Sequence, residues 1–405
     1  MKEKLFTKNF TLLVLGQVSS LFGNYIMRLA LSMYVLELTE SAAVFAGLLS
    51  AATIPTILLS PFGGILADRA DRRNIMVALD AMTGTAVLCA ALLLSEQRAL
   101  VVIGALLVLL SVLGAFETPT VQACIPSMLT GDNIIRGNAV VNQTASISYL
   151  TAPLLGGIFY SAFGIKPVMY ASVLCFFVTA FLECFIRLDY RPAGFGGNAL
   201  AVAKADFLDS VRFIGKERRD ILRILLLAAL SRFFVMGVTL VGLPFLVRTV
   251  LGLDARYYGA AESVLAVAVI AGSMAAGVLA GKIQKGGLSA MLAAVGLCIV
   301  PAGLAFLLPA GTGVRYAVLV AAFCGMQIAI SMFSIYAVSM IQQGTPEYMI
   351  GKVMAYTSAI TMCAQPAGQM VYGFLFDGCK EAVWLLLIPT GVIVCGIGMA
   401  VGRKG

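Results

Sequence analysis

The sequence predicts an all-α membrane protein in which twelve transmembrane helices form two pseudo-symmetric halves of six helices. Of the 405 residues, 60% are hydrophobic and only 12% are charged, about half of the roughly 25% that is usual in soluble domains. The apolar residues lie in blocks of about twenty, the length with which an α-helix crosses the roughly 30 Å hydrocarbon core of a bilayer. Six such blocks lie on each side of one hydrophilic segment, which indicates two halves.

The twelve predicted spans follow one another with short connections, except for the hydrophilic segment after the sixth. Lys2 and Lys8 precede the first span and imitate the basic start of a signal peptide. The apolar run after them is too long for a signal peptide, so we expect a retained first helix. The first six spans are 10–36, 42–67, 75–95, 99–125, 137–163 and 167–186. The other six are 221–247, 257–281, 288–309, 314–341, 349–376 and 382–402.

An internal repeat relates the two halves. Pro153 recurs 213 positions later as Pro366, and the same offset relates a group of residues after the second span to a group after the eighth. A constant offset between distant markers indicates a duplicated unit. We therefore expect an N-terminal bundle at 1–188, a cytoplasmic linker at 189–220 and a C-terminal bundle at 221–405. The group comprises Gly64, Leu66, Ala67, Arg69 and Arg72, which recur as Gly277, Leu279, Ala280, Lys282 and Lys285.

The distribution of positive charge predicts the orientation. The net charge is +8, which by itself would suggest a nucleic-acid partner. However, 20 of the 28 Lys and Arg residues lie at the termini or in even-to-odd connections, six lie on the other side, and Arg28 and Arg232 lie within spans. This asymmetry follows the positive-inside rule. We expect both termini in the cytoplasm, a lipid bilayer as the surrounding partner, and no nucleic acid.

The 189–220 segment is the one long hydrophilic stretch between spans. Leu200, Phe207, Leu208, Val211 and Ile214 recur there at helical spacing among basic residues. This pattern is typical of an amphipathic helix on an anionic membrane surface. The alternative is a plain linker between the halves, and the two roles are compatible.

The sequence lacks the residues of several reactive centres. It contains no histidine, and its nine cysteines form no C-x-x-C pair, so we expect no metal site, no cofactor and no disulfide. The phosphate-binding pattern G-x-x-x-x-G-K-[ST] does not occur, which excludes an ATPase of the P-loop type. Any proton coupling must therefore depend on a carboxylate.

The turn after the second span carries the pattern Gly64-x-x-x-Asp68-Arg69-x-x-Arg72-Arg73. With the twelve spans and the 6+6 repeat, it resembles the signature of the major facilitator superfamily over nearly the whole chain. The segments 17–24, 68–76 and 346–354 resemble the bacterial drug:proton antiporter branch, which includes macrolide efflux proteins and the enterobactin exporter. The resemblance implies the major facilitator fold and a multi-pass transporter, not an enzyme, in the bacterial inner membrane. It also implies alternating access and a functional monomer.

Asp68 is the candidate for a cytoplasmic gate. A carboxylate at the end of the second span can accept hydrogen bonds from a helix N-terminus, and we expect Thr345 to cap the eleventh span with Pro346 in its first turn. The resemblance implies that this contact closes the cytoplasmic side. The alternative is a purely topological anchor. Gly281 replaces Asp68 in the second copy, so the contact should be one-sided. The gate residues are Gly64, Asp68, Arg69, Arg72, Arg73, Thr345 and Pro346.

The fifth span contains Ala152-Pro153-Leu-Leu-Gly156-Gly157. Proline kinks a helix, and glycines allow close approach of backbones. The resembling antiporters carry a Gly-Pro-x-x-Gly-Gly element here that is associated with efflux, although Ala152 replaces its first glycine. A plain kinked packing helix is the alternative.

Charges within the spans are the sharpest functional signal, because each costs at least about 2.5 kcal/mol at mid-bilayer. They are Arg28, Asp80, Glu117, Arg232 and Glu262. In the resembling fold, spans one, four, seven and ten line the central cavity, which implies that Arg28, Glu117 and Arg232 reach a substrate. Polar side chains that could add contacts are Asn24, Asn142, Gln143 and Gln327.

Glu117 is the first candidate for proton coupling, and a structural ion pair is its alternative. Asp80 is the second candidate, and it could instead pair with Arg69, Arg72 and Arg73. Glu262 is the third and could instead neutralise an arginine near the outer surface. The arginine that the resembling family carries in helix four is absent, since its place falls near Leu110, so coupling should differ from the usual scheme.

These observations predict a secondary transporter that exports an amphipathic compound, such as a drug, a macrolide or a siderophore-like molecule, in exchange for protons. Two cavity arginines favour a substrate with an anionic or strongly hydrogen-bonding group. A flippase for lysophospholipids or other lipids is the alternative within the same fold. A membrane-embedded enzyme or a sensor is disfavoured, since the chain offers neither a clustered nucleophile nor a sizeable soluble domain.

Overall fold

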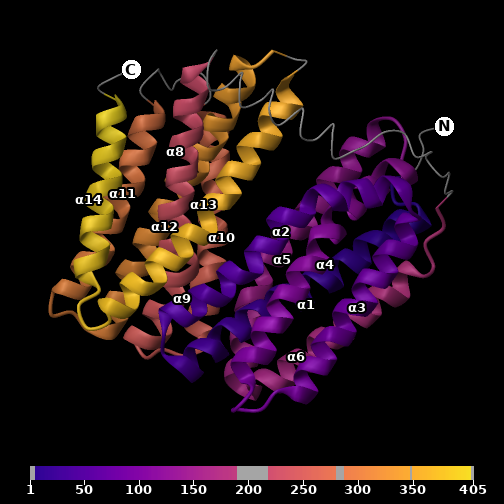
Figure 1. The fold of residues 1–405 in the computed structure, drawn as a ribbon, viewed down its shortest axis with the longest axis horizontal. Coiled ribbons are helices and arrows are strands. Elements are labelled where there is room, and N and C mark those ends of the chain that lie inside the picture. The colour runs from indigo at the N-terminus through magenta and orange to yellow at the C-terminus, as the bar shows by residue number, and fades with distance from the viewer. Residues whose placement is uncertain (1–4, 189–217, 280–286, 347–348, 403–405) are drawn as a thin grey trace. The chain divides into compact units, whose positions relative to one another are not determined.

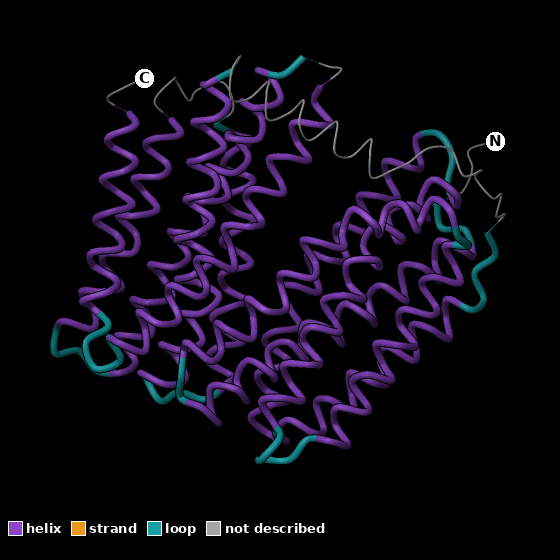
Figure 2. The backbone as a smooth tube through the Cα atoms, in the orientation of Figure 1, coloured by secondary structure: helices purple, strands orange, loops and turns teal. Residues whose placement is uncertain are grey.

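The computed structural model describes residues 5–188, 218–279, 287–346 and 349–402. Every regular element among these residues is a helix, as Figure 2 shows. The first six helices in Figure 1 are α1 Lys8–Thr39, α2 Ala42–Arg69, α3 Arg72–Leu93, α4 Ala99–Met128, α5 Asp132–Phe163 and α6 Ile165–Glu183. The remaining helices are α8 Arg219–Met236, η2 Gly237–Gly242, α9 Leu243–Phe245, η3 Leu246–Val250, α10 Ala255–Val278, α11 Gly287–Leu307, α12 Thr312–Gly344, α13 Ile350–Gly378 and α14 Trp384–Gly402. The expected amphipathic helix at 189–220 falls almost entirely outside the described residues.

The predicted all-α membrane fold is confirmed. Each predicted span coincides with one helix or, for the seventh, with the continuous helical run from Arg219 to Val250. Nine of the described helices are long and apolar enough to cross a bilayer. Leu92, Val101 and Val278 are among the large apolar side chains exposed on their outer faces. Exposed apolar side chains suit contact with lipid. Lipid offers no hydrogen bonds, and a helix needs none because its backbone groups bond to one another.

The helix boundaries follow the internal repeat. Ala42 and Ala99, which begin α2 and α4, lie 213 positions before Ala255 and Thr312, which begin α10 and α12. Relative to the starts of α5 and α6, the correspondence slips by five residues at the start of α13 and by six at the start of α14. The duplication inferred from a few marker residues therefore extends to the placement of most helices.

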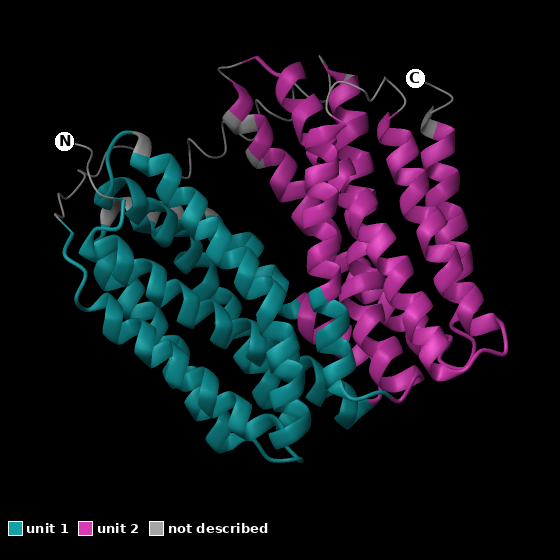
Figure 3. Ribbon diagram, turned by 180° about the vertical axis from the view of Figure 1, so that it is seen from behind, with its two compact units in different colours: residues 1–39, 51–195, 253–263 teal, residues 40–50, 196–252, 264–405 magenta. Residues whose placement is uncertain are grey.

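The helices form two compact units, which Figure 3 distinguishes by colour. Unit 1 comprises residues 1–39, 51–195 and 253–263, and unit 2 comprises 40–50, 196–252 and 264–405. The start of α2 thus packs in unit 2, and the start of α10 packs in unit 1. The simpler division into bundles at the 189–220 linker stays a prediction.

In unit 1, α1 and α6 approach each other closely. A Cβ on Gly23 would lie only 2.9 Å from the Cβ of Cys175, so only glycine fits there. Thr179 of α6 donates a hydrogen bond to the Gly16 carbonyl at 3.1 Å, and Ser172 donates to the Gly23 carbonyl at 3.0 Å. Small residues and hydroxyl groups of this kind hold membrane helices together.

In unit 2, the seventh span departs from regular α-helical pairing. From Gly237 it continues as two π-helical segments, η2 and η3, separated by the short α9. Pro244 lies in α9 and cannot donate a backbone hydrogen bond. Aromatic rings of Tyr372 and Phe376 in α13 pack against Gly237 and Gly242. π-Helical turns inside α-helices frequently mark functional sites.

A carboxylate from α13 caps the start of α2 within unit 2. Asp377 Oδ1 accepts a hydrogen bond from the Ala42 amide at 2.6 Å, and Oδ2 accepts from the Ala43 amide at 3.0 Å and from the Ser41 hydroxyl at 2.5 Å. Amides in the first turn of a helix have no acceptor within that helix. Asp377 therefore adds a cap from another helix to the one that Ser41 supplies, whose hydroxyl accepts the Val44 amide at 3.2 Å.

A second contact joins the same helix ends in a more exposed place. Lys380 Nζ lies 2.8 Å from Glu40 Oε2, with side-chain exposures of 41% and 70%. The hydrogen bond and charge of Lys380 hold the pKa of Glu40 below its usual value. The pair therefore stabilises the fold above the normal carboxyl pKa and loses this effect as the pH falls through the lowered value. Exposed pairs of this kind contribute little.

Candidate functional site

Three carboxyl groups and a serine meet between α1, α3, α4 and α6 of unit 1. Ser20 Oγ lies 3.0 Å from Asp80 Oδ1 and 3.4 Å from Glu117 Oε1. The Glu183 carboxyl group packs beside that of Asp80. Asp80 is 2% exposed and Glu183 is 0% exposed, whereas Glu117 is partly exposed. We call Ser20, Asp80, Glu117 and Glu183 the carboxyl cluster. It brings together two of the three carboxylates predicted for proton coupling.

Asp80 accepts a hydrogen bond from Ser20 and none from Arg72 or Arg73. The side chain of Arg69, the third arginine predicted as an alternative partner, lies outside the described residues. Arg72 Nε donates to the Ala67 carbonyl at 2.9 Å, and Arg73 Nη2 donates to the Cys184 carbonyl at 2.5 Å. Asp80 lies eight residues beyond Arg72 on α3, about 12 Å along the helix axis. The distance explains why Asp80 faces Ser20 instead.

Glu183 was not among the residues that the sequence predicts to be functional. It lies close to the end of the sixth span, where a charged residue usually marks the membrane boundary. The available signal was its neighbourhood, because Leu182, Cys184 and Phe185 are apolar and place a carboxylate inside an apolar run. In the structure Glu183 is buried, and neither of its oxygens has a hydrogen-bond donor among the described residues.

A second polar cluster combines residues of α1, α5 and α10. Tyr258 donates a hydrogen bond to Glu262 Oε1 at 2.6 Å. The charge of Arg28 acts on Glu262 and on the tyrosines. The Tyr25 and Tyr149 rings pack edge to face, 5.6 Å apart. We call these five residues the arginine–tyrosine cluster. Arg28 lies eight residues beyond Ser20, about 12 Å along α1, so the two clusters are separate.

The helix-five element of Pro153, Gly156 and Gly157 packs α5 against two other helices. A Cβ on Gly156 would lie 3.1 Å from the Ile26 Cα of α1, and one on Gly157 would lie 2.6 Å from the Ala255 carbonyl oxygen of α10. The Pro153 carbonyl in turn contacts Gly259 of α10. This geometry supplies the close packing that the sequence predicts, and it leaves the link between this element and efflux as a prediction.

The other predicted substrate contacts are distributed over both units. Asn24, Asn142 and Gln143 are exposed in unit 1. Gln327 is buried at 8% exposure in α12 of unit 2. Arg232 is exposed on α8 of unit 2 and forms no ion pair within the described residues. An unpaired guanidinium in a span is costly unless it faces water or a ligand.

The predicted cytoplasmic gate is described in part. Gly64, Asp68 and Arg69 lie in the last turns of α2, and the side chains at these positions are outside the described residues. Asp71 caps α3 by accepting the Arg73 amide at 3.1 Å. The arginines of this turn thus anchor the beginning of α3, whereas closure by Asp68 stays a prediction.

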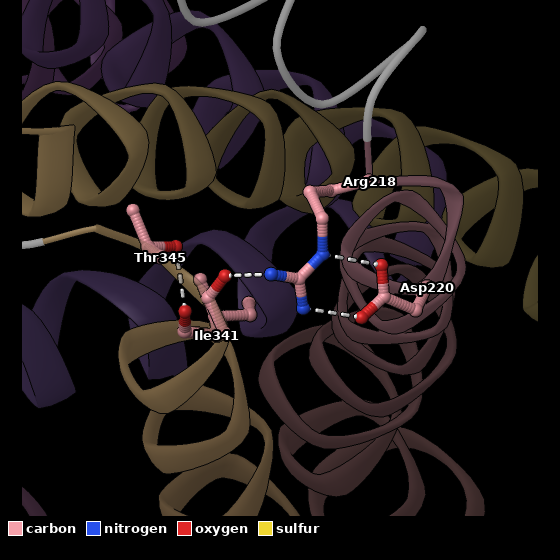
Figure 4. Close-up of polar contacts among 5 residues, drawn as sticks. Arg218, Asp220, Ile341 and Thr345 are labelled. Carbon is pink, nitrogen blue, oxygen red and sulfur yellow. Dashed lines mark hydrogen bonds and ion pairs between the residues drawn. The ribbon is translucent and has the colours of Figure 1, made fainter.

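The expected cap of the eleventh span by Thr345 is wrong. The helix α13 begins at Ile350 and has no side-chain cap, and Pro346 lies before it. Figure 4 shows Thr345 Oγ1 donating instead to the Ile341 carbonyl at 2.7 Å, one turn back in α12. The hydroxyl is therefore used at the end of α12. Beside it, Arg218 forms an ion pair with Asp220 at 2.7 Å and donates to the Gly344 carbonyl.

The carboxyl cluster does not have the geometry of a metal site. No group of three His, Cys, Asp or Glu side chains within the described ranges could hold a metal ion. Burial, shared hydrogen bonds and the absence of a described cationic partner are conditions under which carboxyl groups bind protons.

Known proteins resemble this chain, some of them over almost its whole length. Macrolide efflux protein A of Streptococcus pyogenes is 23% identical over 391 residues, 94% of this chain and 92% of that protein. The multi-drug resistance efflux pump PmrA of Streptococcus pneumoniae is 26% identical over 207 residues, 47% of this chain and 49% of the pump. The crystal structure of the nucleoside transporter NupG has a TM-score of 0.74 at 12% identity and covers 97% of this chain and 99% of that one, which shows a shared fold. Residues 13–369 match the Major Facilitator Superfamily, so the chain belongs to this superfamily of membrane transporters.

Proposed function

We propose that this transporter exports an amphipathic small molecule from a bacterial cell in exchange for protons, by alternating access. The relatives named as macrolide and multidrug efflux proteins support the direction and the substrate class. The observation that carries the proposal is the position of Glu117. Its carboxyl group lies in a membrane span, contacts Ser20 at 3.4 Å and forms no ion pair with a described cationic side chain.

A carboxyl group in this position can link substrate and proton. Burial favours the neutral form of a carboxyl group, whereas a positive charge or hydrogen-bond donor favours the ionised form. A substrate that brings such a group to Glu117 would displace its proton, and a proton would displace the substrate. This mutual exclusion is the minimum that antiport requires.

Two arginines favour a substrate that also carries an anionic or strongly hydrogen-bonding group. Arg28 is exposed beside Glu262, and Arg232 is exposed on α8. The guanidinium fork suits carboxylate and phosphate groups better than an ammonium would. The proposed substrate contacts are Asn24, Arg28, Glu117, Asn142, Gln143, Arg232 and Gln327.

The remaining features of the proposal concern topology. The protein lies in the bacterial inner membrane as a functional monomer. Both termini lie in the cytoplasm, because its basic residues concentrate on one side. Two six-helix bundles, at 1–188 and 221–405, alternate around the substrate. Asp68 and its neighbouring arginines close the cytoplasmic side.

The function is tested by reconstituting the protein in proteoliposomes with an imposed pH gradient. The panel contains macrolides, siderophores and lysophospholipids, each with and without the gradient. Gradient-driven movement of a macrolide or siderophore is the expected result. Movement of lysophospholipids alone would contradict the proposal in favour of a lipid flippase, and transport that ignores the gradient would remove protons from it.

Replacing Arg232 should weaken substrate binding. Arg232→Lys keeps the charge but loses the planar fork, so we expect an affinity loss of about 1.5–3 kcal/mol, as for hydrogen bonds to charged groups, or about ten- to 150-fold in Kd. Arg232→Ala should lose at least as much. Binding is measured on purified, folded protein.

The matched control is Arg223→Lys, at another exposed position of α8 near the start of the helix. It should bind with the affinity of the unmodified protein. Unchanged affinity in both Arg232 variants would leave Arg232 as a structural charge.

A further inference from the structure

The Ser20 hydroxyl has one hydrogen and two carboxyl oxygens within reach. Its Oγ lies 3.0 Å from Asp80 Oδ1 and 3.4 Å from Glu117 Oε1. A hydroxyl group donates one hydrogen bond at a time. At the other contact two oxygen lone pairs would face each other unless that carboxyl group carried a proton and donated it to Ser20. The geometry therefore calls for a proton on Asp80 or Glu117.

A second pair of carboxyl groups lies deeper in unit 1. Glu183 and Asp80 pack beside each other, with exposures of 0% and 2%. Within the described part of the chain, neither Glu183 oxygen nor Asp80 Oδ2 meets a donor. Two carboxylate ions in such a place would cost several kcal/mol each. One proton held between the two groups gives Asp80 Oδ2 and one of the two Glu183 oxygens a hydrogen-bond partner.

Gln17 provides an independent sign that the cluster holds a variable charge. It is 7% exposed, and its Nε2 has no acceptor among the described residues. Gln17 lies three residues before Ser20, on the same face of α1. A buried amide without a partner costs free energy. The Gln17 amide can therefore donate a hydrogen bond to a carboxylate ion when the cluster loses a proton.

Few other charges among the described side chains face the cluster. Arg72 and Arg73 of α3 donate to backbone carbonyls of α2, α4 and the end of α6. Cys184 follows Glu183, and Cys124 of α4 lies near it. The Cys124 side chain is buried, and its thiol donates to the Met76 sulfur at 3.7 Å. The proton balance of the cluster is therefore set mainly by its own three carboxyl groups.

We propose that Glu117, Ser20, Asp80 and Glu183 form a proton relay, with Glu117 as the accessible end and the Asp80–Glu183 pair as a buried proton store. Glu117 gives its hydrogen to Ser20 Oγ as Ser20 gives its own hydrogen to Asp80 Oδ1. One O–H bond breaks at Glu117, one forms at Asp80, and the negative charge moves to Glu117. Asp80 is ionised and able to accept this proton only when the proton of the pair has first moved from Asp80 to Glu183, so after the transfer both groups of the pair are protonated. The use of this relay for coupling rests on the proposed function, whereas the proton store itself does not.

Infrared spectroscopy of the full-length protein in lipid nanodiscs tests the relay without any substrate. The unmodified protein should show the carbonyl stretch of a buried, protonated carboxyl group. The band should change in Asp80→Asn and Glu183→Gln, which assigns it to this pair. After transfer to D₂O the band should shift as deuterium enters through Glu117 and Ser20. In Ser20→Ala the band should persist, but its exchange should slow by about tenfold or more, the factor that corresponds to one lost hydrogen bond.

Ser19→Ala is the matched control, since Ser19 neighbours Ser20 and donates to the Cys175 carbonyl at 2.9 Å. It should exchange at the unmodified rate, and Ser20→Thr, which keeps a hydroxyl, should restore most of the rate. Unmodified exchange in folded Ser20→Ala, or a spectrum unaffected by both Asp80→Asn and Glu183→Gln, would overturn the relay. If the spectra agree with the relay but no pH gradient drives transport, the proton store stands and the proposed antiport fails.

Discussion

Glu117→Gln is expected to reduce gradient-driven transport to the level of protein-free liposomes. Glutamine resembles a permanently protonated carboxyl group, so it can neither release nor accept the coupled proton. Substrate binding should lose most of its pH dependence, because the competing proton is gone. Exchange of substrate between equal pools needs no net proton movement and should survive. The measurement compares gradient-driven uptake, equilibrium exchange and binding across a pH series in the same preparation.

The matched control is Glu96→Gln, which removes one carboxylate at an exposed position between α3 and α4. It should leave all three quantities unchanged. Full gradient-driven transport by Glu117→Gln would exclude Glu117 from coupling and transfer that role to Asp80 or Glu262.

Asp377→Asn is expected to release the start of α2. The Asp377 carboxylate accepts hydrogen bonds from the Ala42 and Ala43 amides and the Ser41 hydroxyl. Asparagine has one acceptor oxygen and turns a donor toward these amides. A loss of about 2 kcal/mol, within the range for hydrogen bonds to charged groups, corresponds to about thirtyfold faster hydrogen–deuterium exchange at these amides. Mass spectrometry of a peptide that covers the start of α2 measures this change.

Lys380→Ala serves as its control, because it removes the neighbouring ion pair with Glu40 but leaves the cap intact. Exposed ion pairs contribute little, so exchange at Ala42 and Ala43 should change little. Equal protection in Asp377→Asn and in the unmodified protein would show that α2 does not depend on Asp377.

The fold follows closely from the sequence because one physical requirement dominates it. Each span must be long and apolar enough to cross a bilayer and must satisfy its own backbone. The pattern of apolar blocks therefore located every helix within a few residues. Pro153 and Pro366, with the markers after the second and eighth spans, were enough to reveal the duplication. The two π-helical segments of the seventh span have no comparable pattern in composition and were not predicted.

The site was only partly predictable, because it depends on which helix faces meet. Asp80 and Glu117 stood out as charges within spans, but nothing in the sequence placed them beside one serine. Glu183 was missed because a charge at the end of a span usually marks the membrane surface. The repeat gave no help, since the positions 213 residues after Asp80 and Glu117 are Ala293 and Ile330.

Helix caps illustrate the same limit. The sequence suggested a carboxylate at the end of α2 that meets the start of α13. The observed contact between these helices in unit 2 joins their opposite ends, with Asp377 at the end of α13 and Ala42 at the start of α2. Cap preferences depend on residue type, but a cap supplied by another helix depends on the tertiary structure. Gly164 occupies the position equivalent to Asp377 in the first half, so the duplication does not predict it either.

The π-helical part of the seventh span contains more residues per turn than an α-helix would. A π turn holds one residue more between bonded groups than an α turn. If one such turn reverts to α-helical pairing, the residues beyond it turn by about 100° about the axis, the angle that one residue occupies. Arg232 precedes η2, and Arg248 lies within η3. Re-pairing of a few backbone hydrogen bonds would thus change the relative direction of these two side chains while the helix stays unbroken. The counterpart of the seventh span in the first half, α1, is α-helical from Lys8 to Thr39 and contains no π turn that could re-pair in this way.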